Sequence, residues 1–165
     1  MGTKPQVVRL LEQRKVAHEV FAFDPAVRSA QSVARETGIA AHLVYKTLVV
    51  EQDPPHGRPF LVMAPGEAEL DLRDLAAALG VKKLRMATHR DAERHTGLRV
   101  GGISALALLG KGFPVLIDSR ALEEGQILVS AGQRGFDVRL AVADLLALTN
   151  ARPVRIAPEA AESGD

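Results

Sequence analysis

Two short apolar runs separated by a turn-forming stretch constrain the fold of this chain more than any other feature. The run YKTLVVEQ (residues 45–52) is rich in β-branched residues, DPPHGR (53–58) is typical of a turn, and PFLVMAP (59–65) is again apolar. Apolar runs of strand length on either side of a segment rich in Pro and Gly predict a hairpin. We therefore expect an antiparallel pair of strands over residues 45–65.

Short apolar segments continue on both sides of this hairpin. Further strands are predicted at residues 17–23, 82–87, 114–119, 126–132 and 136–140. Helices are predicted at residues 5–14, from Ser29 or Ser32 to Thr37, and at residues 71–79, 88–96 and 141–148. Strands and short helices are thus interleaved, but without the regular spacing of βαβ units. This pattern predicts an α+β fold with a mixed sheet rather than a doubly wound parallel sheet.

The composition is that of a globular domain with an aliphatic core. Apolar residues make up 47% of the 165 residues, whereas aromatic residues make up only 4%, with no Trp and one Tyr. This length fits one domain, which we expect over residues 1–155, followed by a disordered tail over residues 156–165. The chain has no Cys, which excludes a disulfide framework, a thiolate metal site and a Cys nucleophile.

Charge and hydropathy restrict the expected partners. The chain has 21 Lys and Arg against 20 Asp and Glu; three of these acids and no base lie in the last ten residues, so residues 1–155 have a net charge of +4. This charge permits a local contact with phosphates but is below that of a general nucleic-acid binder. No apolar run approaches the ~18 residues of a membrane span. The N-terminus is amphipathic and charged rather than signal-like, so we expect a cytoplasmic protein without a membrane partner.

Several segments resemble standard functional motifs but lack a residue or a spacing that the motif requires. GKG at residues 110–112 lacks both the earlier Gly and the following Ser or Thr of a phosphate loop. Ser104 in GGISA lacks the second glycine of a nucleophile elbow and is better explained as the cap of a following helix. His89 and His95 are six residues apart and would not share a helix face. The sequence therefore predicts no metal site.

Two segments carry candidate binding residues. Lys46 begins an apolar strand whose two faces both carry apolar neighbours. It is either an outward strand residue or a partly buried cation that holds a substrate oxygen. The second segment, SAGQRGFD (residues 130–137), follows a buried strand. Its glycines either form a β-turn or allow the backbone to approach a ligand closely.

Three segments are informative in combination: VYKTLVV (44–50), LRVGGISALALLGKGFPVLID (98–118) and LVSAGQRGFDVRL (128–140). Together they resemble the YbaK/EbsC family, and the resemblance extends in the same order over about residues 5–155. Members of this family are free-standing deacylases of mischarged tRNA, related to the editing domain of bacterial prolyl-tRNA synthetases. The resemblance implies a mixed, barrel-like sheet surrounded by short helices.

The resemblance also implies an activity. We expect a trans-editing hydrolase that releases the wrong amino acid from the 3′ aminoacyl end of tRNA, with Cys-tRNA(Pro) as the first expected substrate, and so a role in translation fidelity. No metal or other cofactor is implied, and prolyl-tRNA synthetase is the candidate protein partner. The alternatives are a deacylase for another mischarged tRNA, such as Ala-tRNA(Pro) or Ser-tRNA, and a non-catalytic module that binds an aminoacyl or nucleotide end.

Site residues follow from the same resemblance. Lys46 would orient the tRNA 3′ end, and the main chain at Gly101 would polarise the aminoacyl carbonyl. The other expected substrate-binding residues are Phe23, Thr47, Gly102, Ile103, Ser130, Gly132 and Asp137. Phe23 stands where the family has Tyr, and the missing hydroxyl bears on amino-acid specificity. The resemblance implies attack on the ester by the cysteinyl substrate's own thiol or by water, which fits a chain that has no Cys nucleophile.

Overall fold

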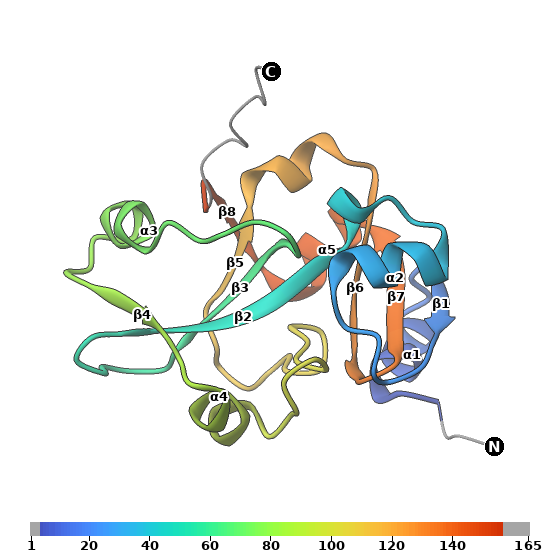
Figure 1. Ribbon diagram of the computed structural model, residues 1–165, viewed down its shortest axis with the longest axis horizontal. Helices are drawn as coiled ribbons and strands as arrows, with labels where there is room; N and C mark the ends of the chain where they lie inside the picture. The colour runs from blue at the N-terminus through green and yellow to red at the C-terminus, as the bar shows by residue number, and fades with distance from the viewer. Residues whose placement is uncertain (1–3, 157–165) are drawn as a thin grey trace.

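The computed structural model describes residues 4–156, which form five α-helices and two β-sheets (Figure 1). The helices are α1 (Gln6–Gln13), α2 (Ala30–Thr37), α3 (Leu72–Leu79), α4 (His89–Thr96) and α5 (Val142–Thr149), with 3-10 turns η1 (Ala41–Leu43) and η2 (Ser119–Glu123). The strands are β1 (His18–Ala22), β2 (Tyr45–Gln52), β3 (Phe60–Pro65), β4 (Leu84–Met86), β5 (Val115–Asp118), β6 (Gln126–Gln133), β7 (Phe136–Ala141) and β8 (Arg152–Val154). The predicted α+β class is confirmed.

The five-stranded sheet is mixed and has the order β4-β2-β3-β5-β8. Its centre is the predicted hairpin, in which β2 and β3 pair antiparallel with Lys46 opposite Ala64. Strand β4 pairs antiparallel with the end of β2, whereas β5 and β8 add to β3 as parallel strands. The three-stranded sheet has the order β1-β7-β6 and is antiparallel throughout. The chain therefore divides its strands between two sheets.

The two sheets do not close into a barrel. Strand β2 is already paired with β3 along one edge, and β4 occupies the far end of its other edge at residues 50–52. The only bridge recorded between the sheets in residues 4–156 is a parallel one between Val44, just before β2, and Leu128 of β6. The barrel-like sheet that the resemblance implies is thus open, with its two halves held together by packing.

An aliphatic core joins the two sheets. The main cluster combines Leu61 and Ile117 of the five-stranded sheet with Ile127 and Leu140 of the three-stranded sheet, and all four are fully buried. Helices α1 and α5 pack onto this cluster, whereas α3 and α2 each cover a smaller cluster of their own. The one Tyr is the only buried aromatic residue of the described part. Burial of apolar surface contributes about 25 cal/mol per Å², so this shared core is what holds the sheets together.

Helix ends follow the predicted signals. Ser29, not Ser32, caps α2, because its side chain accepts the N–H of Ser32. Thr88 caps α4 by accepting the N–H of Asp91. The Asp91 carboxylate accepts a hydrogen bond from Arg94 Nη2 and not from the backbone N–H of Thr88, so only half of a capping box forms. The helices α2, α3 and α4 all end at a glycine with a left-handed backbone.

Three features were not predicted correctly. Ser104 accepts the N–H of Ala107, but the residues that follow form consecutive turns, so it caps no helix. Strand β8 was missed because it is short and contains Pro153, which a sheet tolerates only at an edge. Of the expected tail, Ile156 is buried in the core, and residues 157–165 lie outside the described residues. The described residues contain no helix long and apolar enough to cross a membrane.

Candidate active site

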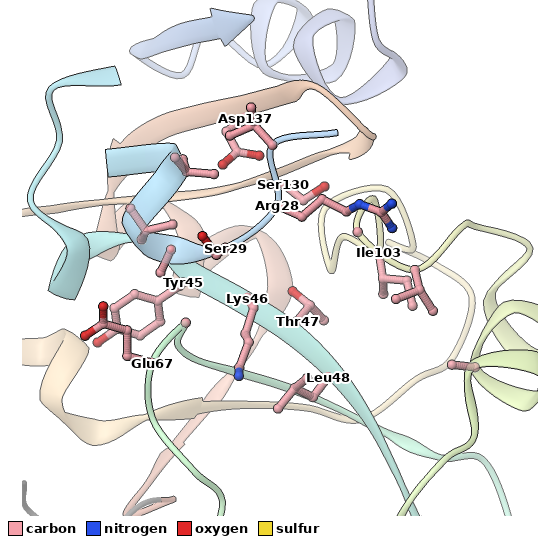
Figure 2. A pocket seen from close by; sticks show the side chains of 18 of the residues that line it. Arg28, Ser29, Tyr45, Lys46, Thr47, Leu48, Glu67, Ile103, Ser130 and Asp137 are labelled. Atoms are coloured by element: carbon pink, nitrogen blue, oxygen red, sulfur yellow. The ribbon is translucent and has the colours of Figure 1, made fainter. Parts of the chain in front are cut away.

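A cavity of about 650 Å³ is lined by residues of both sheets (Figure 2). Strand β2 contributes five consecutive residues, from Tyr45 to Val49, and β6 and β7 contribute Ser130 and Asp137. Most of the remaining lining comes from the loop before α2, from α2 itself, from Gly66 and Glu67 after β3, from the end of β4 and the first half of α4, and from Val100, Gly101 and Ile103. Such a volume lies within the range of about 300–1,000 Å³ that is typical of small-molecule sites.

Seven of the nine residues predicted for the site line this cavity. They are Phe23, Lys46, Thr47, Gly101, Ile103, Ser130 and Asp137. Gly102 and Gly132 do not line it. Residues separated by more than 100 positions in the sequence are thus brought to one place by the contact between the two sheets.

Lys46 and Thr47 extend from opposite faces of β2. Figure 2 shows the Lys46 side chain on the same side as Leu48, whereas Thr47 lies on the side of Ser130. This is the alternation predicted from the sequence. Lys46 is half-buried, and its amino group makes no hydrogen bond or ion pair with another described residue. The site therefore holds a partly desolvated cation that is available to an incoming oxygen atom.

The Gly101 loop is held from two sides. The N–H of Val100 donates to Glu93 Oε2 of α4 at 2.8 Å, and the Val100 carbonyl accepts from Arg134 Nε at 2.7 Å. The N–H of Gly102 donates to the Arg99 carbonyl at 2.8 Å, so this amide is already used within the loop. The N–H of Gly101 makes no hydrogen bond with another described residue. Of the two neighbouring glycine amides, only that of Gly101 is free to donate to a ligand.

Gly102 and Gly132 have packing roles instead. A Cβ on Gly102 would lie 3.0–3.2 Å from backbone atoms of Gln133 and Arg134, so the absence of a side chain lets the loop pack against the β6–β7 turn. Gly132 has a φ of +94° and its N–H donates to Ser130 Oγ at 3.1 Å, within an irregularity of the strand pairing. This irregularity holds the Ser130 hydroxyl in place, directly opposite Asp137 in the β6–β7 pairing.

Comparison with known proteins decides the family. The sequence profile described as "Aminoacyl-tRNA editing domain" matches residues 24–148. The chain belongs to this family. A curated relative from Enterococcus faecalis (strain ATCC 700802 / V583), provisionally named as a Cys-tRNA(Pro)/Cys-tRNA(Cys) deacylase, EbsC, is 38% identical over 149 residues, or 89% of each chain.

Solved structures share the fold of this editing domain. One, described provisionally as a trans-editing enzyme for prolyl-tRNA synthetase, has a TM-score of 0.79 and 23% identity, and the match covers 95% of this chain and 99% of the other. Another is part of a Marinobacter aquaeolei VT8 chain described provisionally as a signal transduction protein. It has a TM-score of 0.68 and 19% identity, and the match covers 95% of this chain but 31% of the longer one. At these identities the likeness concerns the fold.

Several charged residues that line the cavity were missed in the sequence. Arg28, Glu67 and His89 all line the cavity, and all three are exposed. Arg28 and Glu67 lie in or beside a turn and His89 is the first residue of α4, and at such positions a charged residue carries no pattern that separates it from ordinary solvent-exposed surface. His95 does not line the cavity, and its Nε2 lies 3.7 Å from Glu51 Oε2. Within residues 4–156, His, Asp and Glu form no group of three or more that could hold a metal ion.

Burial changes the acidity of two groups that line the site. It raises the pKa of Tyr45 to about 12, and the nearby Asp118 carboxylate adds to this effect. Burial also raises the pKa of Asp137 to about 6 from an ordinary value of 3.8. Loss of solvent disfavours the charged form in both cases. The Tyr45 phenol therefore stays neutral at physiological pH, whereas Asp137 titrates near pH 6.

The Asp137 carboxyl is expected to lower stability at neutral pH. The pKa of Asp137 is higher in the folded than in the unfolded chain, so the folded state binds the proton more tightly. The resulting loss of stability is fully present above pH 6 and fades as the pH falls toward 4. Asp137→Asn should raise the free energy of unfolding at pH 7.5 by about 1–3 kcal/mol and by much less at pH 4. Urea unfolding at both pH values tests this, with the exposed Glu36→Gln as control. An equal gain at both pH values would contradict it.

Proposed function

We propose that this chain is a trans-editing deacylase that hydrolyses the ester between a wrong amino acid and the 3′ end of tRNA, with Cys-tRNA(Pro) as its first substrate. The observation that carries the proposal is the meeting of Lys46 and Gly101 in one cavity of a chain that belongs to the aminoacyl-tRNA editing domain family. The identity of 38% with a relative named for deacylation of Cys-tRNA(Pro) supports this choice of substrate.

Lys46 and Gly101 have separate tasks in the proposed reaction. The Lys46 ammonium holds a ribose or phosphate oxygen of the terminal adenosine and so fixes the ester in the cavity. The free N–H of Gly101 donates to the aminoacyl carbonyl and stabilises the negative charge that develops on that oxygen in the transition state. An aminoacyl ester is already labile, so two such contacts in a partly desolvated cavity suffice for catalysis. Thr47, Ile103, Ser130 and Asp137 shape the cavity around the substrate.

The nucleophile in this proposal comes from outside the protein. Water attacks the carbonyl carbon, the ester C–O bond breaks, and the ribose oxygen takes up the proton. A cysteinyl substrate offers its own thiol as a second nucleophile. The sulfur attacks the carbonyl carbon, the ester C–O bond breaks, the ribose oxygen takes up the thiol proton, and water then opens the cyclic thioester. The two routes differ in their requirement for sulfur. Release of alanine from Ala-tRNA(Pro) therefore requires the water route.

Amino-acid selection is proposed to depend on the apolar lining and on Phe23. An apolar pocket discriminates by only about 1–3 kcal/mol per methylene group, so closely related small amino acids are the natural competitors of cysteine. Phe23, which lines the cavity, offers no hydroxyl to a polar side chain. Ala-tRNA(Pro) and Ser-tRNA are for this reason the second candidate substrates.

The proposal extends to partners and context. Residues 1–155 act as one editing domain, in the cytoplasm, where tRNA is charged. With a net charge of only +4 over these residues, the domain has weak intrinsic affinity for tRNA, because such affinity scales with the number of phosphates neutralised. We therefore propose that prolyl-tRNA synthetase presents the mischarged tRNA.

Release of labelled amino acid tests the proposed function. Cys-tRNA(Pro), Ala-tRNA(Pro) and Ser-tRNA are each incubated with the protein, with and without prolyl-tRNA synthetase, and spontaneous hydrolysis is subtracted. We expect the fastest release from Cys-tRNA(Pro) and a further increase when the synthetase is present. Folded protein that releases none of the three amino acids, even with synthetase, would reject the deacylase and favour the non-catalytic binding module.

A further inference from the structure

Arg28 is an unpaired cation at the rim of the cavity. It lies in the loop between β1 and α2, immediately before the cap residue Ser29, and it lines the cavity. Its side chain is exposed and makes no hydrogen bond or ion pair with another described residue. The nearest acid of the same loop, Asp24, accepts the N–H of Ala26 at 2.8 Å. Arg28 therefore has no carboxylate partner within residues 4–156.

The stem of Arg28 crosses over Gly101. A Cβ on Gly101 would lie 2.9 Å from Arg28 Cδ and 3.3 Å from Arg134 Nε, so the two arginines flank this glycine. The two arginines differ in their hydrogen bonds: Arg134 Nε donates to the Val100 carbonyl, whereas the Arg28 guanidinium donates to no other described residue. Arg28 thus places a free guanidinium group beside the glycine whose N–H is free. Figure 2 shows this guanidinium on the side of β2 where Ser130 lies, whereas the Lys46 amino group lies on the opposite side of the strand.

The two cations of the cavity therefore address different parts of a ligand. In an aminoacyl ester the carboxyl group is esterified and carries no charge, so the amino-acid end offers no anion to a second cation. The remaining negative charge of an aminoacylated 3′ end belongs to its phosphates. A guanidinium group matches a phosphate well because it can donate two parallel hydrogen bonds.

We propose that Arg28 is a positioning residue that binds the phosphate on the 5′ side of the terminal adenosine and so directs the ester toward Gly101. This inference rests on the proposed function and narrows it: Arg28 binds the nucleotide phosphate, which leaves a ribose oxygen as the partner of Lys46. Arg28 does not touch the reacting atoms, so its loss raises KM and leaves kcat nearly unchanged.

Two minimal substrates that differ only in a phosphate test this inference. One is 3′-cysteinyl adenosine and the other is the same ester with a 5′-phosphate. Arg28→Gln should lower kcat/KM for the phosphorylated ester by about five- to tenfold through KM, since an exposed charged contact has a modest effect. It should change kcat/KM for the unphosphorylated ester less than about twofold. Arg35→Gln, an exposed arginine of α2 outside the cavity lining, is the matched control and should leave both values unchanged.

An equal loss on both esters, or no loss on either, would overturn the inference. A binding measurement separates this result from failure of the proposed function. The probe is an acceptor-stem RNA hairpin that ends in CCA, and its affinity is measured at several salt concentrations. Arg28→Gln should reduce the slope of log affinity against log salt by about one, as expected for the loss of one phosphate contact. An unchanged slope would reject the phosphate contact, whether or not the wild-type protein hydrolyses either ester.

Discussion

Replacement of Lys46 by alanine should lower kcat/KM for release of cysteine from Cys-tRNA(Pro) by at least about 100-fold, the effect of removing a preorganised charge from a partly desolvated site. The fold should persist, because Lys46 contributes to the sheet through its backbone pairing with Ala64 and its side chain makes no hydrogen bond or ion pair with another described residue. Single-turnover release of labelled cysteine gives the rate, and circular dichroism and thermal unfolding report the fold.

Two further variants make this test specific. Lys46→Arg retains the charge but presents it in a planar, longer group, and we expect partial activity. Lys82→Ala removes an exposed lysine that does not line the cavity and should leave the rate unchanged. If the Lys46→Ala protein is folded and deacylates at the wild-type rate, Lys46 is not the residue that orients the substrate.

Replacement of Gly101 by alanine should lower kcat/KM by about 10- to 100-fold, because the added methyl group would displace the backbone N–H that is proposed to donate to the developing oxyanion. The backbone there has a φ of +95°, and a Cβ would lie 2.9 Å from Arg28 Cδ. The new methyl group would therefore both strain the loop and displace the arginine stem. The free energy of unfolding should fall by about 1–2 kcal/mol, the cost of placing a residue with a Cβ in a left-handed conformation. Rates on Cys-tRNA(Pro) and urea unfolding measure the two effects.

Gly110 offers a matched control for this substitution. It has a φ of +78°, but no atom lies within 4 Å of the position of its missing Cβ. Gly110→Ala should therefore lower the free energy of unfolding by a similar amount, because it introduces the same backbone strain. It should change kcat/KM less than about twofold, because it does not alter the cavity. Equal loss of activity in the two variants would show that general destabilisation, and not the geometry at Gly101, explains the effect.

The local elements could be predicted because their signals are local. The hairpin of β2 and β3 follows from two β-branched runs around a turn, and α2 follows from a serine cap and a terminal glycine. The parallel pairing of β5 with β3 has no such signal, because it joins residues about 55 positions apart through packing. The division of the strands into two open sheets likewise depends on which edge of β2 remains free.

The candidate site was predictable only through the resemblance. Alternation along β2 indicated that Lys46 and Thr47 point in opposite directions, which is confirmed, but it could not indicate that the cavity takes lining from both faces of this strand. The hydrogen bond that occupies the Gly102 amide depends on how residues 99–102 turn, which no spacing rule reveals. The position of Arg28 over Gly101 requires the packing of two distant loops.

Discrimination between wrong and correct amino acids on the same tRNA tests the central claim most directly. Cys-tRNA(Pro) and Pro-tRNA(Pro), with different labels, are mixed with the wild-type protein, and the release of each amino acid is followed in the same reaction. An editing deacylase should release cysteine at least about tenfold faster than proline, because the proline side chain is closed into a ring on its amino nitrogen and has no thiol that could attack the ester. Equal rates for the two amino acids, or no release above spontaneous hydrolysis, would contradict an editing function.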